Sequence, residues 1–149
     1  MLRDTIKTET VTAMKAKDKE RTAALRLISA KIKDRDIEMR GKDVPDDDAM
    51  VIDVLQKMAK QRRESIQMYE DGGRTELAAQ EKQELAVIEE FLPQQMSEAE
   101  TKAKIEEIKA ELGAEGMKDM GRVMGELKKR HGTELDMGRA SGWVKESLS

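Results

Sequence analysis

The residues of this chain that could carry chemistry are acids and bases, with few nucleophiles or metal ligands among them. His131 is the only histidine, and the sequence contains no cysteine. A zinc–thiolate site, a thiolate nucleophile and a disulfide are therefore excluded, and a Ser-His-Asp triad or a histidine metal site would depend on one residue. His131 lies beside Gly132 after a basic helix end, which favours a solvated or helix-capping role. We expect no catalytic residue, no metal and no cofactor.

Adjacent carboxylates are common but are badly placed for catalysis. Glu89-Glu90 and Glu106-Glu107 lie in stretches with helical spacing, where neighbouring positions point about 100° apart. Such a pair cannot converge on one substrate atom, so a solvated helix face is the better interpretation. The sequence also lacks the glycine-rich loops GxxxxGK[ST] and strand-linked GxGxxG, and so offers no ready cradle for a nucleotide.

The composition predicts a modest core without aromatic anchors. Of the 149 residues, 40% are charged and 2% aromatic, so aliphatic residues and the eleven Met must build the core. Met fills gaps well but specifies packing weakly. The first twenty residues mix acids with bases and contain no long apolar run, which predicts neither a signal peptide nor a membrane span. A cytoplasmic protein is therefore expected.

Apolar residues at helical spacing, together with start and stop signals, predict seven helices and no strand. Asp18 is suited to cap the second helix, and Ser97 with Glu100 forms the SxxE pattern of a capping box before the fifth. Leu77, Leu85, Ile88 and Leu92 are expected to face the core from the fourth helix. The helices are expected at about 2–16, 18–41, 49–72, 75–92, 97–113 and 120–130, followed by a loop bracketed by Gly132 and Gly138 and a short last helix with Trp143, Val144 and Leu148.

Punctuation between the helices predicts two groups of them. Gly72 and Gly73 let the chain turn back, because glycine adopts left-handed backbone angles at little steric cost. The third and fourth helices should then form an antiparallel hairpin that ends before Pro93. The chain is expected to be all-α, with a four-helix unit at residues 1–95 and a three-helix C-terminal module at residues 96–149.

A cationic patch is expected on the third helix. It contains Lys60, Arg62 and Arg63. Ion pairing with Glu64 or with a neighbouring helix is favoured there over binding of an external ligand.

Gly121 and Gly125 lie four residues apart on the sixth predicted helix, and therefore on one face of it. Glycine costs about 1 kcal/mol relative to alanine inside a helix, so something is expected to approach this backbone closely. A tightly packed neighbouring helix is one interpretation. A nucleic-acid backbone or a partner surface is the other.

Two blocks of the sequence resemble the GatB/YqeY family. The first runs from KQRRESI at residues 60–66 through YEDGGR at 69–74 to FLPQQ at 91–95, and the second is MKDMGRVMG at 117–125. The resemblance covers nearly the whole chain and implies an all-α fold. Its C-terminal module is similar to the tail of the tRNA-dependent amidotransferase B subunit, which is implicated in holding tRNA. Carbon–nitrogen ligase activity with glutamine as amide donor would follow only by family resemblance.

A role in holding tRNA, if it transfers, implies phosphate contacts by cations in and after the second block. Residues 117–149 carry seven Lys and Arg against five Asp and Glu, while the whole chain carries a net charge of −3. Glu134 and Asp136 replace part of a basic turn found in the family and lower the local positive potential. An ordinary mixed-charge surface is the alternative for these residues, which are Lys118, Arg122, Lys128, Lys129, Arg130, Arg139 and Lys145.

Three functions remain open from the sequence. A non-catalytic tRNA-binding adaptor, linked to tRNA-dependent amidation, would read tRNA by shape and backbone, and its affinity would fall with salt. Scarce aromatics argue against binding of single strands by base stacking. A helical protein-interaction module, with an aminoacyl-tRNA pathway protein or another copy as partner, is the main alternative. An enzyme with an unrecognised site is the least favoured.

Overall fold

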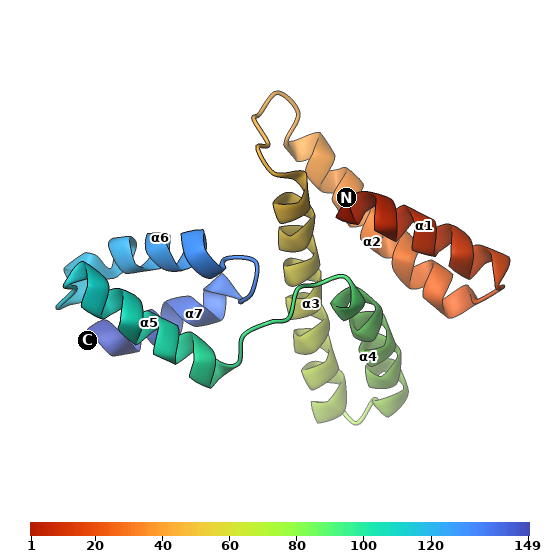
Figure 1. Ribbon diagram of the computed structural model, residues 1–149. Helices are drawn as coiled ribbons and strands as arrows, with labels where there is room; N and C mark the ends of the chain where they lie inside the picture. The colour runs from red at the N-terminus through yellow and green to blue at the C-terminus, as the bar shows by residue number, and fades with distance from the viewer. The chain divides into compact units, whose positions relative to one another are not determined.

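The computed structural model describes all 149 residues, and every regular element in it is a helix (Figure 1). The expectation of an all-α protein is confirmed. The chain forms two compact units, an N-terminal unit at Met1–Leu92 and a C-terminal unit at Pro93–Ser149. The N-terminal unit contains α1 to α4, and the C-terminal unit contains α5 to α7 with one short 3₁₀ helix. The elements are α1 Leu2–Lys15, α2 Lys19–Glu38, α3 Asp47–Asp71, α4 Thr75–Glu90, α5 Glu98–Leu112, η1 Met117–Asp119, α6 Met120–His131 and α7 Met137–Leu148.

Several helix ends lie where local sequence signals predict them. The Asp18 side chain accepts a hydrogen bond from the Arg21 N–H at 3.1 Å and caps α2, and the Ser97 hydroxyl accepts one from the Glu100 N–H at 3.1 Å and caps α5. Each cap satisfies one of the N–H groups that a first turn leaves free. Gly113 ends α5 with φ of +64°, the left-handed conformation that glycine adopts easily.

The start of α7 differs from the prediction. The expected loop reached Gly138, but α7 begins at Met137 and includes that glycine. The reason is Asp136, whose carboxylate accepts from the Gly138 N–H at 2.8 Å and caps the helix. A good N-cap contributes about as much as one glycine costs, so the helix starts earlier than glycine spacing suggests.

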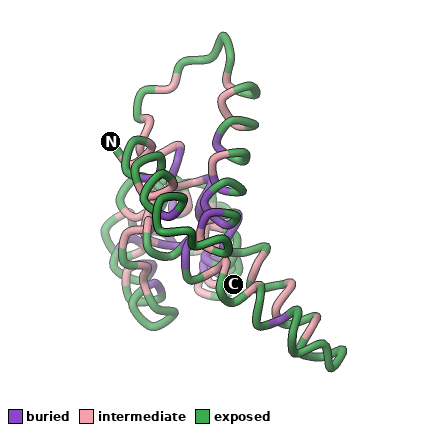
Figure 2. Tube along the Cα trace, turned by 90° about the vertical axis from the view of Figure 1, so that its right-hand side faces the viewer, coloured by how far each residue is buried: buried purple, intermediate pink, exposed green.

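The N-terminal unit is built from two antiparallel helical hairpins, α1 with α2 and α3 with α4 (Figure 1). Their facing sides form one aliphatic core, while most outer turns are exposed (Figure 2). Leu77 departs from its predicted inward position and is 38% exposed. It lies in the first turn of α4, at the turn end of the hairpin, and the neighbouring Ala78 is buried there instead. Fully buried side chains of this core include Ile6, Leu25, Ile28, Val51, Leu55 and Ile88.

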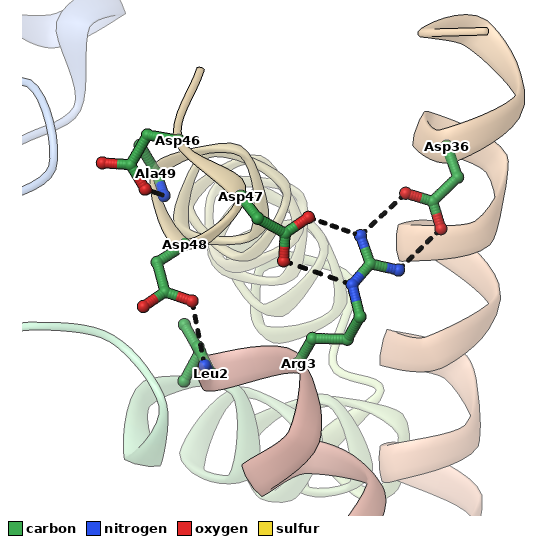
Figure 3. Close-up of polar contacts among 7 residues, drawn as sticks. All are labelled: Leu2, Arg3, Asp36, Asp46, Asp47, Asp48 and Ala49. Carbon is green, nitrogen blue, oxygen red and sulfur yellow. Dashed lines mark hydrogen bonds and ion pairs between the residues drawn. The ribbon is translucent and has the colours of Figure 1, made fainter. Parts of the chain in front are cut away.

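Arginines join the helices of the N-terminal unit. Arg3 of α1 forms two hydrogen bonds to Asp36 of α2, at 2.7 and 2.8 Å, and two to Asp47 of α3, at 2.9 and 3.2 Å (Figure 3). Paired N–H···O bonds to a carboxylate fix geometry as well as adding energy. The same corner is closed by the Leu2 N–H, which donates to Asp48 at 2.9 Å. One side chain therefore links the start of α1 to two other helices.

Arg3→Ala is expected to lower the free energy of unfolding by about 1–2 kcal/mol at pH 7, a value reduced for partial exposure. Hydrogen bonds from Arg3 hold the pKa of Asp36 below its ordinary value. A carboxyl whose pKa is lowered by folding stabilises the folded protein at pH values above its pKa in the unfolded chain, which is about 4. This contribution is lost as the pH falls through its pKa in the folded protein. Urea denaturation at pH 7 and pH 3 should thus show a smaller difference between variant and wild type at pH 3. Arg40→Ala, which removes an exposed arginine without an ion pair, is the control, and a pH-independent difference would contradict this account.

Candidate nucleic-acid interface

One side of α6 packs into the C-terminal unit and the other faces solvent. Val123 and Leu127 are fully buried, and Met120 and Met124 are partly buried beside them. Because successive residues turn by about 100°, the opposite side of the helix presents a different set. We call this set the α6 outer face, and all its members are exposed: Gly121, Arg122, Gly125, Lys128 and Lys129.

The two glycines of the α6 outer face have no close neighbour. A Cβ atom added to Gly121 or Gly125 would meet nothing within 4 Å. The interpretation that a neighbouring helix packs tightly on them is therefore wrong. They border a shallow, open depression between α5 and α6, whose other lining residues are Glu111, Leu112, Arg122 and Glu126. Backbone is thus accessible along two turns of α6.

Gly125→Ala is expected to raise the free energy of unfolding by about 0.5–1 kcal/mol. Alanine loses less backbone entropy on folding, the helical conformation suits it, and the added methyl group meets open space. Urea denaturation of the variant measures the change. Gly113→Ala is the matched control and should destabilise, because its φ of +64° is strained for alanine. A loss of stability in Gly125→Ala would show that something in the folded chain occupies this space.

The arginines predicted as phosphate contacts already have partners within the chain. The Arg122 guanidinium donates to the Leu112 carbonyl at 2.7 Å, at the end of α5, and remains more than half exposed. Arg130 lies 2.6 Å from the Glu111 carboxylate and 2.7 Å from the Glu126 carboxylate. These bonds raise the pKa of Arg130 above its ordinary value. Arg130 thus ties α6 to α5 with its charge matched by two acids.

The lysines of the predicted set are exposed and form no ion pair. Lys118 lies in η1, just before α6, and Lys128 and Lys129 lie in the last turn of α6. Cations in a last turn are stabilised by the negative end of the helix dipole. Their side chains nevertheless extend into solvent and can meet an anion.

The remaining two predicted cations lie on α7 rather than on α6. Six residues separate Arg139 from Lys145, which places them about 120° apart around the helix. The Arg139 guanidinium lies 5.2 Å from the centre of the Trp143 ring, whereas Lys145 is exposed without an ion pair. The structure therefore brings Arg122, Lys128 and Lys129 together with the glycines, and leaves Arg139 and Lys145 on separate sides of another helix.

The sequence predicts that His131 is solvated or caps a helix; it lies in the last turn of α6 and is more enclosed than a solvated residue would be. Its side chain is 18% exposed, and its Nδ1 atom lies 3.6 Å from the Glu134 carboxylate. The backbone turns directly after it, since the Glu134 N–H donates to the His131 carbonyl at 2.9 Å.

Two of the three cations in the patch on α3 form ion pairs within the N-terminal unit. Arg62 Nε lies 3.1 Å from Glu81 and 2.9 Å from Glu84, both on α4. Arg63 approaches Glu89 of α4 at 3.6 Å. The prediction of ion pairing with a neighbouring helix is confirmed for Arg62 and Arg63, whereas Lys60 is exposed and forms no ion pair.

The structure contains neither a cluster of metal ligands nor a helix suited to span a membrane. No group of three or more His, Asp and Glu side chains is arranged to hold a metal ion. None of the helices combines the length and the apolar character needed to cross a membrane.

Comparison with known proteins gives one family and a set of fungal relatives. A family model described as Yqey-like protein matches residues 3–148. The protein of Lachancea thermotolerans named "Altered inheritance of mitochondria protein 41, mitochondrial" is 34% identical over 102 residues, which cover 67% of this chain and 54% of the relative. The protein of the same name in Eremothecium gossypii is 35% identical over 80 residues, 54% of this chain and 43% of the relative. That of Saccharomyces cerevisiae strain S288c is 32% identical over 82 residues, 55% of this chain and 43% of the relative.

These relatives correct one expectation. The chain spans about half the length of the curated relatives that it matches. Their names place them in mitochondria, which contradicts the cytoplasmic location expected from the N-terminal composition. An absence of apolar runs near the N-terminus carries no information about mitochondrial import, since import leaders are amphipathic rather than apolar.

Proposed function

The chain belongs to the Yqey-like protein family, and from this premise we propose that it is a non-catalytic adaptor that binds tRNA and aids tRNA-dependent amidation. The family is that of the amidotransferase B-subunit tail domain. The observation that carries the proposal is the α6 outer face, where two glycines without close neighbours lie among cations. A small-residue strip permits close approach of a sugar–phosphate backbone, and flanking lysines neutralise its charge.

We assign a role to each predicted cation according to whether it forms an ion pair within the C-terminal unit. Lys128 and Lys129 form no ion pair, so they are assigned to phosphates, with Lys118 as a further contact. Arg130 is matched by Glu111 and Glu126, and its assigned role is to hold α6 on α5. Arg122 is hydrogen-bonded to the end of α5 but remains more than half exposed, so it can both hold α6 on α5 and contact a phosphate.

Recognition through this face would be by backbone and shape. Lysine acts as a flexible point charge without bidentate geometry, so it gives affinity with little base discrimination. A-form helices expose their phosphates and 2′-hydroxyls, and their deep major groove is closed to side chains. The proposed ligand is therefore a helical arm of tRNA, with no preference among tRNA sequences arising from α6.

Titration of fluorescently labelled tRNA, followed by anisotropy at 50 to 200 mM salt, tests the proposal. Bulk tRNA and mitochondrial tRNA are both included because the named relatives are mitochondrial. We expect saturable binding that weakens with salt; two to four neutralised phosphates predict a loss of about 10-fold to 150-fold across this range. Duplex DNA of equal length is the control and should bind more weakly. Absence of tRNA binding at 50 mM salt would refute the proposed function.

A second candidate is a protein-interaction module, and exposed apolar side chains favour it. Val11 and Met14 lie about one turn apart on α1 and are each 49% exposed, and Met68 of α3 is 73% exposed. Met side chains adapt to varied partner surfaces. A defined partner whose binding is insensitive to salt, in a chain that fails to bind tRNA, would favour this alternative.

A further inference from the structure

Trp143 lies at the edge of the C-terminal core, near one cation of α5 and one cation of α7. Its ring packs partly against the buried cluster but is not itself fully buried. The Lys102 ammonium lies 5.9 Å from the ring centre, and the Arg139 guanidinium lies 5.2 Å from it. Both distances fall within the range of a cation–π interaction. The only tryptophan of the chain is thus held, partly exposed, beside two positive charges.

The two cations differ in whether their charge is matched. Lys102 lies 2.9 Å from the Glu98 carboxylate, and this hydrogen bond lowers the pKa of Glu98. Arg139 is exposed and forms no ion pair, although its charge also contributes to the lowered pKa of Glu98. Arg139 is therefore the charge at this site that is available to an anion. Its flat guanidinium can also stack on a planar ring.

We infer that Trp143 and Arg139 form a stacking site for one unpaired nucleobase of single-stranded RNA, with Arg139 reaching the adjoining phosphate. Base–aromatic stacking accepts any base, because every base has a π-face, and arginine adds to it. One aromatic residue suits one base, which agrees with a composition too poor in aromatics for a longer track. The choice of RNA rests on the proposed function, but the site lies on α5 and α7 and is separate from the α6 outer face.

The test uses the full chain with a 12-nucleotide oligoadenylate, and a 12-base-pair RNA duplex for comparison, at 50 mM salt. Because Trp143 is the only tryptophan, every change in tryptophan emission reports on this site. We expect saturable quenching by the single strand and little change with the duplex. Anisotropy of the labelled single strand should show a loss of affinity of about 5-fold to 150-fold in Trp143→Leu. Trp143→Phe, which keeps an aromatic ring, should retain most of the affinity.

Two further variants separate the possible outcomes. Arg139→Gln should weaken single-strand binding without disturbing the core. It tests the stacking site if circular dichroism shows that Trp143→Leu does not fold. Unchanged single-strand affinity in a folded Trp143→Leu or in Arg139→Gln would overturn the stacking site. Lys128→Gln with Lys129→Gln tests the α6 outer face separately. If Lys128→Gln with Lys129→Gln abolishes tRNA binding while Trp143→Leu leaves single-strand binding unchanged, the stacking site is refuted and the proposed function is supported.

Discussion

Arg62→Ala is expected to lower the free energy of unfolding by about 2–4 kcal/mol, the largest stability loss among the ion pairs of this chain. Arg62 lies between Glu81 and Glu84, and the three side chains are only 18%, 21% and 19% exposed. Removing the arginine leaves two carboxylates facing each other with little water to solvate them. Urea denaturation at pH 7 measures the loss. In the variant, the contact between α3 and α4 should open before the rest of the N-terminal unit unfolds.

Arg63→Ala is the matched control for Arg62→Ala. Arg63 and Glu89 are 45% and 50% exposed and 3.6 Å apart. An exposed pair of this kind contributes about 0–1 kcal/mol, so the loss should be small. Equal losses in the two variants would contradict the assignment of Arg62 as the clamp between the hairpin helices.

Lys128→Glu combined with Lys129→Glu is expected to lower tRNA affinity by at least about 10-fold at 50 mM salt. Two phosphate contacts are lost, and two negative charges then face the RNA. Anisotropy with labelled tRNA measures the change, and circular dichroism checks the fold. Glutamate in the last turn of α6 opposes the helix dipole and costs about 0.3–1 kcal/mol at each position, which the C-terminal unit should tolerate.

Lys31→Glu combined with Lys33→Glu controls for net charge. Both lysines are exposed on α2 and form no ion pair, so the substitutions change the charge by the same amount. This control should change tRNA affinity by less than about 3-fold. An equal loss in both double variants would mean that overall charge, rather than the α6 outer face, governs binding.

Local sequence signals predict the helices well because each depends on a few adjacent residues. Asp18 and Ser97 cap helices through the N–H three residues on, and Gly113 supplies its own left-handed turn. The hairpin that places Arg62 opposite α4 follows from Gly72 and Gly73, with Gly73 at φ of +72°. These features require no knowledge of distant parts of the chain.

The candidate site depends on contacts between distant parts of the chain, and local sequence patterns do not predict these contacts. Helical spacing places Gly121 and Gly125 on one face but cannot say whether a neighbour covers it, and the structure leaves it open. Charge patterning groups Arg130 with the lysines, although Glu111 from another helix neutralises it. The position of His131 beside Gly132 likewise does not indicate that its side chain is only 18% exposed, with the Glu134 carboxylate 3.6 Å from Nδ1.

The most direct test of the proposed role compares the salt dependence of tRNA binding in the wild type and in Lys128→Gln combined with Lys129→Gln. The logarithm of the binding constant is plotted against the logarithm of salt concentration from 50 to 200 mM. If these two lysines contact phosphates, the slope should become shallower by about one for each lysine removed. Parallel lines with equal affinity would show that tRNA, if bound, is held elsewhere and that the α6 outer face is not the interface.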